Sequence, residues 1–176
     1  MATKEPPRAD GQPLRQVESF DSFYRREMPA LVRFTTALVR RRDVAEELAQ
    51  EAMLRAHARW DQVSSYDDPS AWVRRVAANA AKNVFRRWSI ESRTLVRARS
   101  WRADEAAEAR QGSMAPELWE AVSRLPLQQR SAVALYYLED RSLEDIAIII
   151  GCSASTARVH LHRGRQQLAQ AMGDES

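Results

Sequence analysis

Cysteine is almost missing from this chain, because Cys152 is the only one among 176 residues. A single cysteine excludes an intrachain disulfide, and this is typical of a reducing compartment, so we expect a cytoplasmic protein. The chain also lacks an uninterrupted run of about 18 apolar residues, the length that a membrane-spanning helix needs. Residues 1–17 are polar and lack the apolar core of a signal peptide, so we expect a disordered tail there and no membrane insertion.

Glycine and lysine are also scarce. The chain has 5 glycines, 44% hydrophobic residues and 29% charged residues, a composition that favours an all-α protein. Because Lys4 and Lys82 are the only lysines, the net charge of +3 comes almost entirely from arginine. Arginine pairs bidentately with phosphates and bases, which favours a nucleic-acid partner. A genome whose base composition enriches arginine and alanine would give the same bias, so composition alone leaves this open.

The usual signs of an enzyme are missing as well. We find no paired catalytic carboxylates, no glycine-rich loop for phosphates and no nucleophile triad, so we expect no catalytic activity. His160 and His162 suggest a metal site at first sight. Residues two apart on a helix point about 200° away from each other, so these two cannot easily share an ion. We therefore expect neither a metal nor a cofactor.

The chain divides into two blocks with helical spacing of apolar residues, separated by a segment without it. In the first block, Pro29 marks a kink or break, and Asp43 marks the start of a helix that reaches about Trp60. Loop residues follow, and a further helix covers 70–88. The pattern predicts an all-α fold of two small helical domains joined by a flexible linker. The expected segments are a disordered tail at 1–17, a first domain at 18–90, a linker at 91–115, a second domain at 116–172 and a tail at 173–176.

Residues 143–165 have the layout of a helix-turn-helix: a short helix, a turn at Gly151 and a second helix. The apolar stripe of the second helix, which we expect to be buried, consists of Ala157, Leu161, Gly164 and Leu168. The opposite face carries no acidic residue, which suits contact with phosphates in the major groove; the alternative is an ordinary surface helix. The side chains expected to contact duplex DNA, including supporting phosphate contacts, are Arg130, Ser153, Ser155, Thr156, Arg158, Val159, His162, Arg163 and Arg165.

Two features of the first block favour binding partners. The predicted helix over 43–56 has an acidic face that suits docking on a basic coiled coil, although an ordinary solvated helix face is the alternative. Downstream, aromatic residues lie among arginines, a pattern that suits single-stranded DNA because bases stack on rings and phosphates pair with arginine. For Trp72 and Phe85, packing in the core remains an equal alternative.

Four motifs resemble those of extracytoplasmic-function sigma factors. Residues 43–56, DVAEELAQEAMLRA, resemble the polymerase-binding helix D-A-E-D-L-V-Q-E-x-F-L-R-A of that family. Residues 72–79, WVRRVAAN, resemble W-L-x-x-I-A-R-N, and residues 125–130, LPLQQR, resemble L-P-x-x-Q-R. The helix-turn-helix resembles G-x-S-x-G-T-V-K-S-R-L-H-R-A-R. The motifs occur in the same order as in the family and cover about residues 20–168.

The resemblance implies a sigma factor that joins core RNA polymerase and directs it to promoters. It implies docking on the clamp helices of the largest subunit and on the flap of the second-largest, and control by an anti-sigma factor. The second domain would read the −35 element as duplex, through the nine residues named above. The implied core-binding residues are Asp43, Glu46, Glu47, Leu48, Gln50, Glu51 and Arg55. The residues implied for the single-stranded −10 element are Trp60, Ser64, Tyr66, Asp67, Trp72, Arg74, Arg75, Asn79, Lys82, Asn83, Arg86 and Arg87.

Several positions depart from the family pattern. Asn83 stands where aspartate is common and Ala78 where arginine is common. Ser155 and Ala157 replace glycine and valine, and Val159 replaces serine, so the promoter sequence is not predicted from the family. Two other functions remain as alternatives: a repressor or activator that binds duplex DNA without polymerase, and a helical adaptor that binds only proteins.

Overall fold

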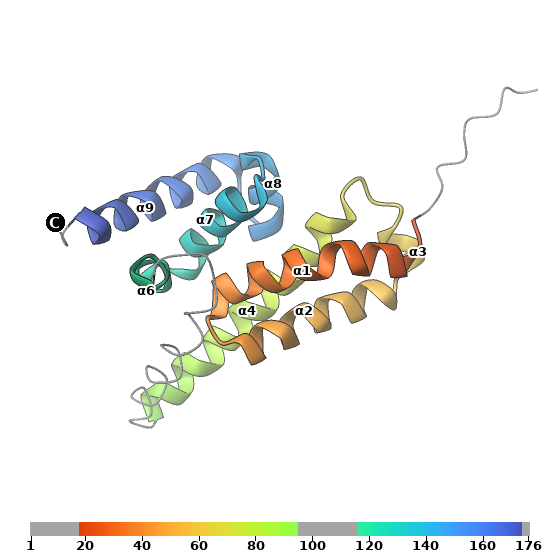
Figure 1. Cartoon of the computed structure of the whole chain (residues 1–176), viewed down its shortest axis with the longest axis horizontal. Helices are drawn as coiled ribbons and strands as arrows, with labels where there is room; N and C mark the ends of the chain where they lie inside the picture. Colours follow the sequence, from red (N-terminus) through yellow and green to blue (C-terminus); the bar gives the residue numbers. More distant parts are fainter. Residues whose placement is uncertain (1–17, 95–115, 174–176) are drawn as a thin grey trace, which may run out of the picture.

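The computed structural model describes residues 18–94 and 116–173, and in these ranges every regular element is a helix (Figure 1). The all-α prediction is confirmed. The first group of helices is α1 (Phe20–Val39), α2 (Arg42–His57), α3 (Trp60–Val63) and α4 (Pro69–Thr94). The second group is α6 (Pro116–Arg124), α7 (Leu127–Glu139), α8 (Leu143–Ile150) and α9 (Ala154–Gly173). The predicted tail at 1–17, most of the linker and residues 174–176 lie outside the described residues.

Helices α1 and α2 pack against each other in the first group. The break expected at Pro29 is wrong, because α1 continues through this residue. At the end of α1, Arg40 adopts a left-handed conformation with φ of 61°, which turns the chain directly into α2. The buried hydroxyl of Thr35 shares its single proton between the carbonyl oxygens of Leu31, at 3.0 Å, and Ala45, at 2.9 Å. These bonds tie α1 to the start of α2, within a core that includes Phe34.

The second group contains the predicted helix-turn-helix. Ser142 and Asp145 form a capping box at the start of α8: the Ser142 hydroxyl accepts from the Asp145 N–H at 3.1 Å. The turn after α8 depends on Gly151, whose φ of 74° is a conformation that side chains disfavour. On α9, Ala157, Leu161 and Gly164 are buried, as the apolar stripe predicted. The stripe sets which face of α9 is left exposed.

The two groups pack tightly against each other. In Figure 1, α7 and α8 lie along α1 and α4, and side chains from both groups form one apolar core. Phe34 and Leu38 of α1 belong to this core together with Leu135 of α7 and Ile150 of α8. Two tethered domains were expected from the sequence, and their mutual packing was not. No helix within the described ranges is long and apolar enough to span a membrane.

Candidate nucleic-acid and protein-binding surfaces

The exposed face of α9 carries the side chains predicted to enter the major groove. Ser155, Arg158, Val159 and His162 are all exposed, and Val159 keeps 44% of its surface accessible although it is apolar. Arg163 and Arg165 are exposed beside them, as are Ser153 and Thr156 at the start of the helix. The described part of this helix has no acidic residue. The face therefore combines short, apolar and cationic side chains on one continuous helical surface.

Hydroxyl groups cluster at the start of α9. The Ser153 hydroxyl accepts from the backbone N–H of Thr156 at 3.1 Å, and its oxygen lies 2.8 Å from the hydroxyls of both Ser155 and Thr156. Ser153 thus caps the helix. The remaining free N–H groups and the positive end of the helix dipole favour an anion such as phosphate at this point.

Two titratable groups next to the core are held uncharged at neutral pH. Burial, assisted by Arg163, lowers the pKa of the half-buried His160. Burial raises the pKa of the Cys152 thiol, and the nearby charge of Lys82 offsets this only in part. Neither group therefore adds a charge beside the exposed face of α9.

Arg130 is the exception among the predicted −35 contacts, because it is only 6% exposed. Its guanidinium donates to the carbonyl oxygens of Leu38 and Ser123, and to that of Leu125 at 3.0 Å. It also lies over the ring of Phe85, 5.5 Å from the ring centre. In this arrangement Arg130 joins the start of α7 to the first group. A phosphate contact is not available to it here, because its donors are directed to buried carbonyls.

The acidic face of α2 is exposed as the sequence predicted. Along this helix, Arg42 pairs with Glu46 at 2.9 Å and Arg55 with Glu51 at 2.5 Å. A hydrogen bond from Arg41 holds the pKa of Asp43 below its usual value, so this carboxylate stays ionised. The side chains of the predicted core-binding set that are exposed are Asp43, Glu47, Gln50, Glu51 and Arg55, with Glu46 half-buried.

Leu48 does not lie on this exposed face, which corrects its assignment as a docking side chain. It is 4% exposed and packs in the core between α1, α2 and α4. The leucine that the acidic face does present is Leu54, with 68% of its surface exposed. Leu54 lies four residues after Gln50 and seven after Glu47, so it shares their side of the helix. This spacing could have identified it from the sequence.

One side of α4 is exposed and carries cations and amides. Arg75, Asn79, Asn83, Arg86 and Arg87 are all accessible to solvent. In the segment before α4, Tyr66 and Asp67 are exposed, while the half-buried Ser64 donates to the Asp61 carbonyl oxygen at 3.4 Å. The side chains proposed for −10 DNA that are accessible therefore come from two places, the 61–68 segment and one side of α4.

The tryptophans of this region take structural positions. The indole N–H of Trp60 donates to the carbonyl oxygen of Glu18 at 3.1 Å, and its ring lies 4.9 Å from that of Phe23. These contacts fix the start of α1, so Trp60 is not free to stack on a base in this arrangement. Trp72 and Phe85 are half-buried and pack against the core, each leaving part of its ring exposed.

Two cations of α4 are turned toward the second group of helices. Arg74 is 3% exposed, and it pairs with Glu27 of α1 at 2.8 Å and with Glu139 of α7. The Lys82 ammonium donates to the carbonyl oxygen of Ile150, at the end of α8, at 3.1 Å. In this arrangement Arg74 is withdrawn from DNA, because its guanidinium is paired in the interface between the two groups.

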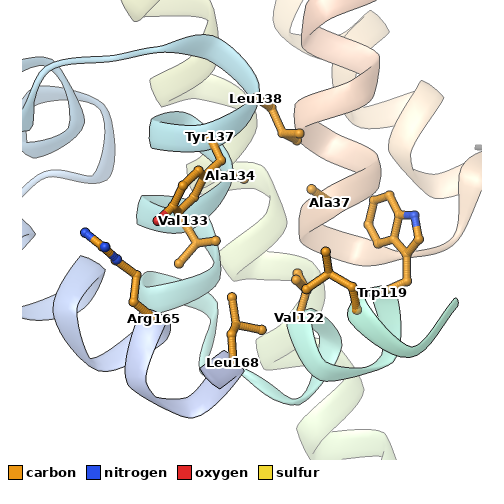
Figure 2. A pocket seen from close by; sticks show the side chains of 10 residues that line it. Ala37, Trp119, Val122, Val133, Ala134, Tyr137, Leu138, Arg165 and Leu168 are labelled. Atoms are coloured by element: carbon orange, nitrogen blue, oxygen red, sulfur yellow. The ribbon is translucent and has the colours of Figure 1, made fainter. Parts of the chain in front are cut away.

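An apolar cavity that the sequence did not reveal lies between α6, α7, α9 and the end of α1. It has a volume of about 280 Å³, and Figure 2 shows Trp119, Val133 and Leu168 pointing into it from three different helices. Tyr137 and Arg165 line its edge. Apart from Ala37 of α1, the lining belongs to the second group of helices, so this group presents an apolar groove as well as a cationic face.

Known proteins resemble this chain in both sequence and fold. Residues 23–89 match the family model for Sigma-70 region 2, and residues 116–168 match that for Sigma-70, region 4. The chain is 30% identical to ECF RNA polymerase sigma factor SigM of Mycobacterium tuberculosis, over 88% of this chain and 78% of that protein. It is 29% identical to the RNA polymerase sigma-E factor of Streptomyces avermitilis, over 89% of this chain and 87% of that protein.

Two solved structures have the same fold. The sigma factor RpoE of Bartonella quintana, in complex with the anti-sigma factor NepR, matches with a TM-score of 0.71 and 24% identity. The alignment covers 88% of this chain and 96% of that one. CnrH, in complex with the cytosolic domain of CnrY, matches with a TM-score of 0.61 and 18% identity, over 89% of both chains. The sequence matches, in register over both helical groups, show that this chain belongs to the extracytoplasmic-function sigma factors of RNA polymerase and directs transcription initiation.

Proposed function

We propose that this sigma factor reads its promoters with two separate surfaces: α9 on the −35 duplex, and the 61–68 segment with α4 on the opened −10 strand. The observation that carries this proposal is the exposed face of α9. It presents cationic and small side chains and no carboxylate, which phosphates would repel. A helix of this kind at the second position of a helix-turn-helix fits the major groove.

On the −35 element, the side chains divide by reach and chemistry. Ser155, Arg158, Val159 and His162 occupy the exposed middle of the face and are suited to base edges, with Val159 offering an apolar surface to a thymine methyl group. Arg163 and the hydroxyl cluster at Ser153 are suited to phosphates, which position the helix without reading sequence. Recognition of −35 DNA therefore depends on residues that α8 and the buried stripe of α9 hold in place.

On the −10 element, the exposed strip of α4 supplies the cations. Arg75, Arg86 and Arg87 can pair with phosphates of a single strand, and Tyr66 is the exposed ring on which a base can stack. Trapping an unpaired base costs a few kcal/mol of lost stacking and pairing. Stacking on Tyr66 and contacts from polymerase would offset this cost.

The acidic face of α2 is the proposed docking surface for core polymerase. Glu47, Gln50 and Glu51 precede the exposed Leu54 on the same side of the helix, so that an apolar contact lies beside negative charge. A basic helical partner complements such a surface, and the clamp helices of the largest subunit are the expected partner. Charge complementarity would orient the two proteins and accelerate their association.

The apolar groove of the second group is the proposed site for the flap of the second-largest subunit. Its lining is almost entirely apolar and is formed by α6, α7 and α9 (Figure 2). A groove between helices accommodates the apolar side chains of an amphipathic segment. Binding there would hold the second group on polymerase while α9 faces the DNA on its other side.

We also propose that an anti-sigma factor controls this protein. Both structural neighbours named above were solved with a protein partner bound. RpoE is in complex with the anti-sigma factor NepR, and CnrH is in complex with the cytosolic domain of CnrY. A partner that covers the α2 face or the groove would block polymerase. Since polymerase works in the cytoplasm, we place the protein there.

Run-off transcription with purified core polymerase tests the promoter-reading proposal. A library of random promoters should yield transcripts that share two sequence elements, one near −35 and one near −10. Mutating the exposed face of α9 should change only the upstream element. If no promoter from the library supports transcription, the two-surface assignment is wrong. Tight binding to palindromic duplex DNA without polymerase would instead favour a repressor or activator, and polymerase binding without any DNA contact would favour an adaptor.

A further inference from the structure

The contact between Arg74 and Glu139 joins the two halves of the molecule. Arg74 belongs to α4 and Glu139 to the end of α7, 65 positions further along the chain. Both side chains are almost fully buried, with 3% and 6% of their surfaces exposed. Arg74 also pairs with Glu27 at 2.8 Å and donates to the Ser70 carbonyl oxygen at 3.0 Å. The guanidinium is thus bonded to both groups, through its Nε and its Nη1.

Arg141 makes a second bridge a short distance away. It comes from the turn between α7 and α8 and donates to the carboxylate of Asp68 at 2.6 Å and to the hydroxyl of Ser70. Its Nε also lies 3.7 Å from the Glu139 carboxylate. Asp68 and Ser70 lie at the start of α4, directly after the segment proposed to trap the −10 base. The second group is therefore bonded to the proposed −10 surface where the 61–68 segment meets α4.

The same interface holds the −35 reader too close to the −10 reader for promoter binding. Lys82 of α4 reaches the end of α8 at 3.1 Å, and α9 begins four residues later. The −35 and −10 elements are about 25 base pairs apart, which is about 85 Å of duplex at 3.4 Å per base pair. A helix of 20 residues, the length of α9, spans about 30 Å. The closed arrangement therefore cannot occupy both elements at once.

We propose that Arg74, Glu139 and Arg141 form a latch that holds the free chain closed, and that the chain must release it before polymerase and promoter are bound. The partner that this surface fits is the chain's own second group of helices. The inference rests on the proposed function, because the second group of helices and the −10 strand would compete for the same residues of α4. Arg74 then has a role in each state: it is paired with Glu139 in the closed chain and is exposed in the open one.

The chemistry of the latch suits release. Replacing hydration by a buried ion pair brings little net stability, because the desolvation of both ions opposes their attraction. In addition, Glu139 Oε1 is buried and has no hydrogen-bond partner among the described residues, which leaves part of that desolvation uncompensated. On opening, Arg74 keeps Glu27, which lies in its own group of helices. The closed state can therefore be the more populated one in the free chain and still open when polymerase and promoter bind.

The test uses the full chain with two fluorophores, one on each group. Cysteines at the exposed positions Gln62 and Gln170, in a Cys152→Ser background, carry the labels, and energy transfer reports closure. Glu139→Gln removes the charge from the latch and leaves each arginine one carboxylate, Glu27 or Asp68. The control is Glu120→Gln, which makes the same change in an exposed pair with Arg124 inside α6.

We expect Glu139→Gln to raise the open-to-closed ratio by about tenfold or more, as transfer efficiency falls. Because only the open chain can occupy both promoter elements, the amount of promoter complex that unlabelled Glu139→Gln forms with core polymerase should rise by a similar factor, up to the point where the open state dominates. Glu120→Gln should change neither quantity. Arg141→Gln, which removes the second bridge, should shift both in the same direction as Glu139→Gln, and circular dichroism verifies that each variant keeps its helices.

Unchanged transfer efficiency in folded Glu139→Gln and Arg141→Gln would overturn the latch, as would a wild-type chain that is already as open as these variants. Opening without any gain in promoter complexes would overturn its inhibitory role. If the chain opens on mutation but no variant binds core polymerase, the latch proposal stands and the proposed function is refuted. The two failures are thus distinguishable.

Discussion

Gly164 of α9 lies against Val133 of α7 so closely that a Cβ atom on the glycine would stand 2.7 Å from Val133 Cγ2. The same atom would be 3.4 Å from the carbonyl oxygen of Gln129, so the neighbouring backbone also limits any adjustment. Glycine at this position lets α9 pack directly on α7. The orientation of the exposed face of α9 depends on this close approach.

Gly164→Ala should therefore destabilise the second group of helices, although alanine has the higher helix propensity. Overpacking of a well-filled core costs about 1–3 kcal/mol, which exceeds the gain of about 1 kcal/mol from replacing glycine in a helix. Urea unfolding followed by circular dichroism measures the difference. Gly173→Ala is the matched control, since a Cβ there meets nothing within 4 Å. Equal stability of the two variants would show that α7 and α9 can separate without cost.

Leu54→Asp should weaken binding to core polymerase while leaving the protein folded. Leu54 is 68% exposed on the acidic face of α2, so an added charge there disturbs the docking surface and not the core. Leu48→Asp makes the same chemical change at a buried position, where an unpaired carboxylate costs several kcal/mol and should unfold the first group. Thermal melts and a polymerase pull-down with purified components measure the two effects. Loss of binding in Gln50→Ala with an unchanged melting temperature would further support the α2 face.

The contrast between these two leucines shows how far the sequence could lead. Helical spacing correctly predicted the buried stripe of α9, because its members repeat at positions that a helix places on one side. It also predicted the turn at Gly151, which depends only on neighbouring residues. On α2 the buried Leu48 shares the helical spacing of Ala45, Ala49, Ala52 and Met53, and Leu54 lies outside this stripe. Periodicity therefore contained the distinction, whereas the assignment of Leu48 to the docking surface followed from the family resemblance.

Arg74 and Arg130 were beyond sequence reasoning for a different reason. Both are arginines in motifs that resemble DNA-binding segments, and both are buried between the two groups of helices. Their partners, Glu139 for Arg74 and the carbonyl oxygen of Leu38 for Arg130, lie 65 and 92 positions away. Only the packing of the two groups brings them together. No local pattern encodes such a contact, so the sequence could predict the cations but not what they bind.

Arg158→Ala should weaken transcription in a promoter-dependent way. Arg158 is exposed at the centre of the α9 face, and loss of a bidentate contact with a base costs about 1–3 kcal/mol at promoters that carry that base. At promoters that already lack the contacted base, Arg158→Ala should lower activity little further, because the contact is already absent there. Arg163→Ala is the control, because loss of a phosphate contact lowers activity at all promoters by a similar factor. A uniform loss in Arg158→Ala across a set of −35 variants would assign it to phosphate as well.

Acid should destabilise the closed protein through Glu27 and Asp68. Burial opposes the ionisation of Glu27, but the bonds from Arg74 and Arg26 outweigh it, so its pKa is lowered. Burial likewise opposes ionisation of Asp68, while Ser70, the Ala71 N–H and Arg141 together lower its pKa. Both carboxyls therefore bind protons more readily in the unfolded chain. Their contribution to stability is complete above the unfolded pKa of about 4 and is lost as the pH falls through the folded values.

His160 also makes the protein less stable as the pH falls, and its effect begins at a higher pH than that of the two carboxyls. Its folded pKa is lowered, so the unfolded chain takes up a proton first as the pH falls below about 6.5, and stability decreases from there. Urea unfolding between pH 7 and pH 3 should thus show a small decline beginning near pH 6.5 and a steeper one below about pH 4.5. Glu27→Gln should be less stable than the wild type at pH 7 and should approach it at the acidic end, because protonation then removes the same charge from both. A constant difference between the two proteins across this range would mean that Arg74 gains nothing from the charge of Glu27.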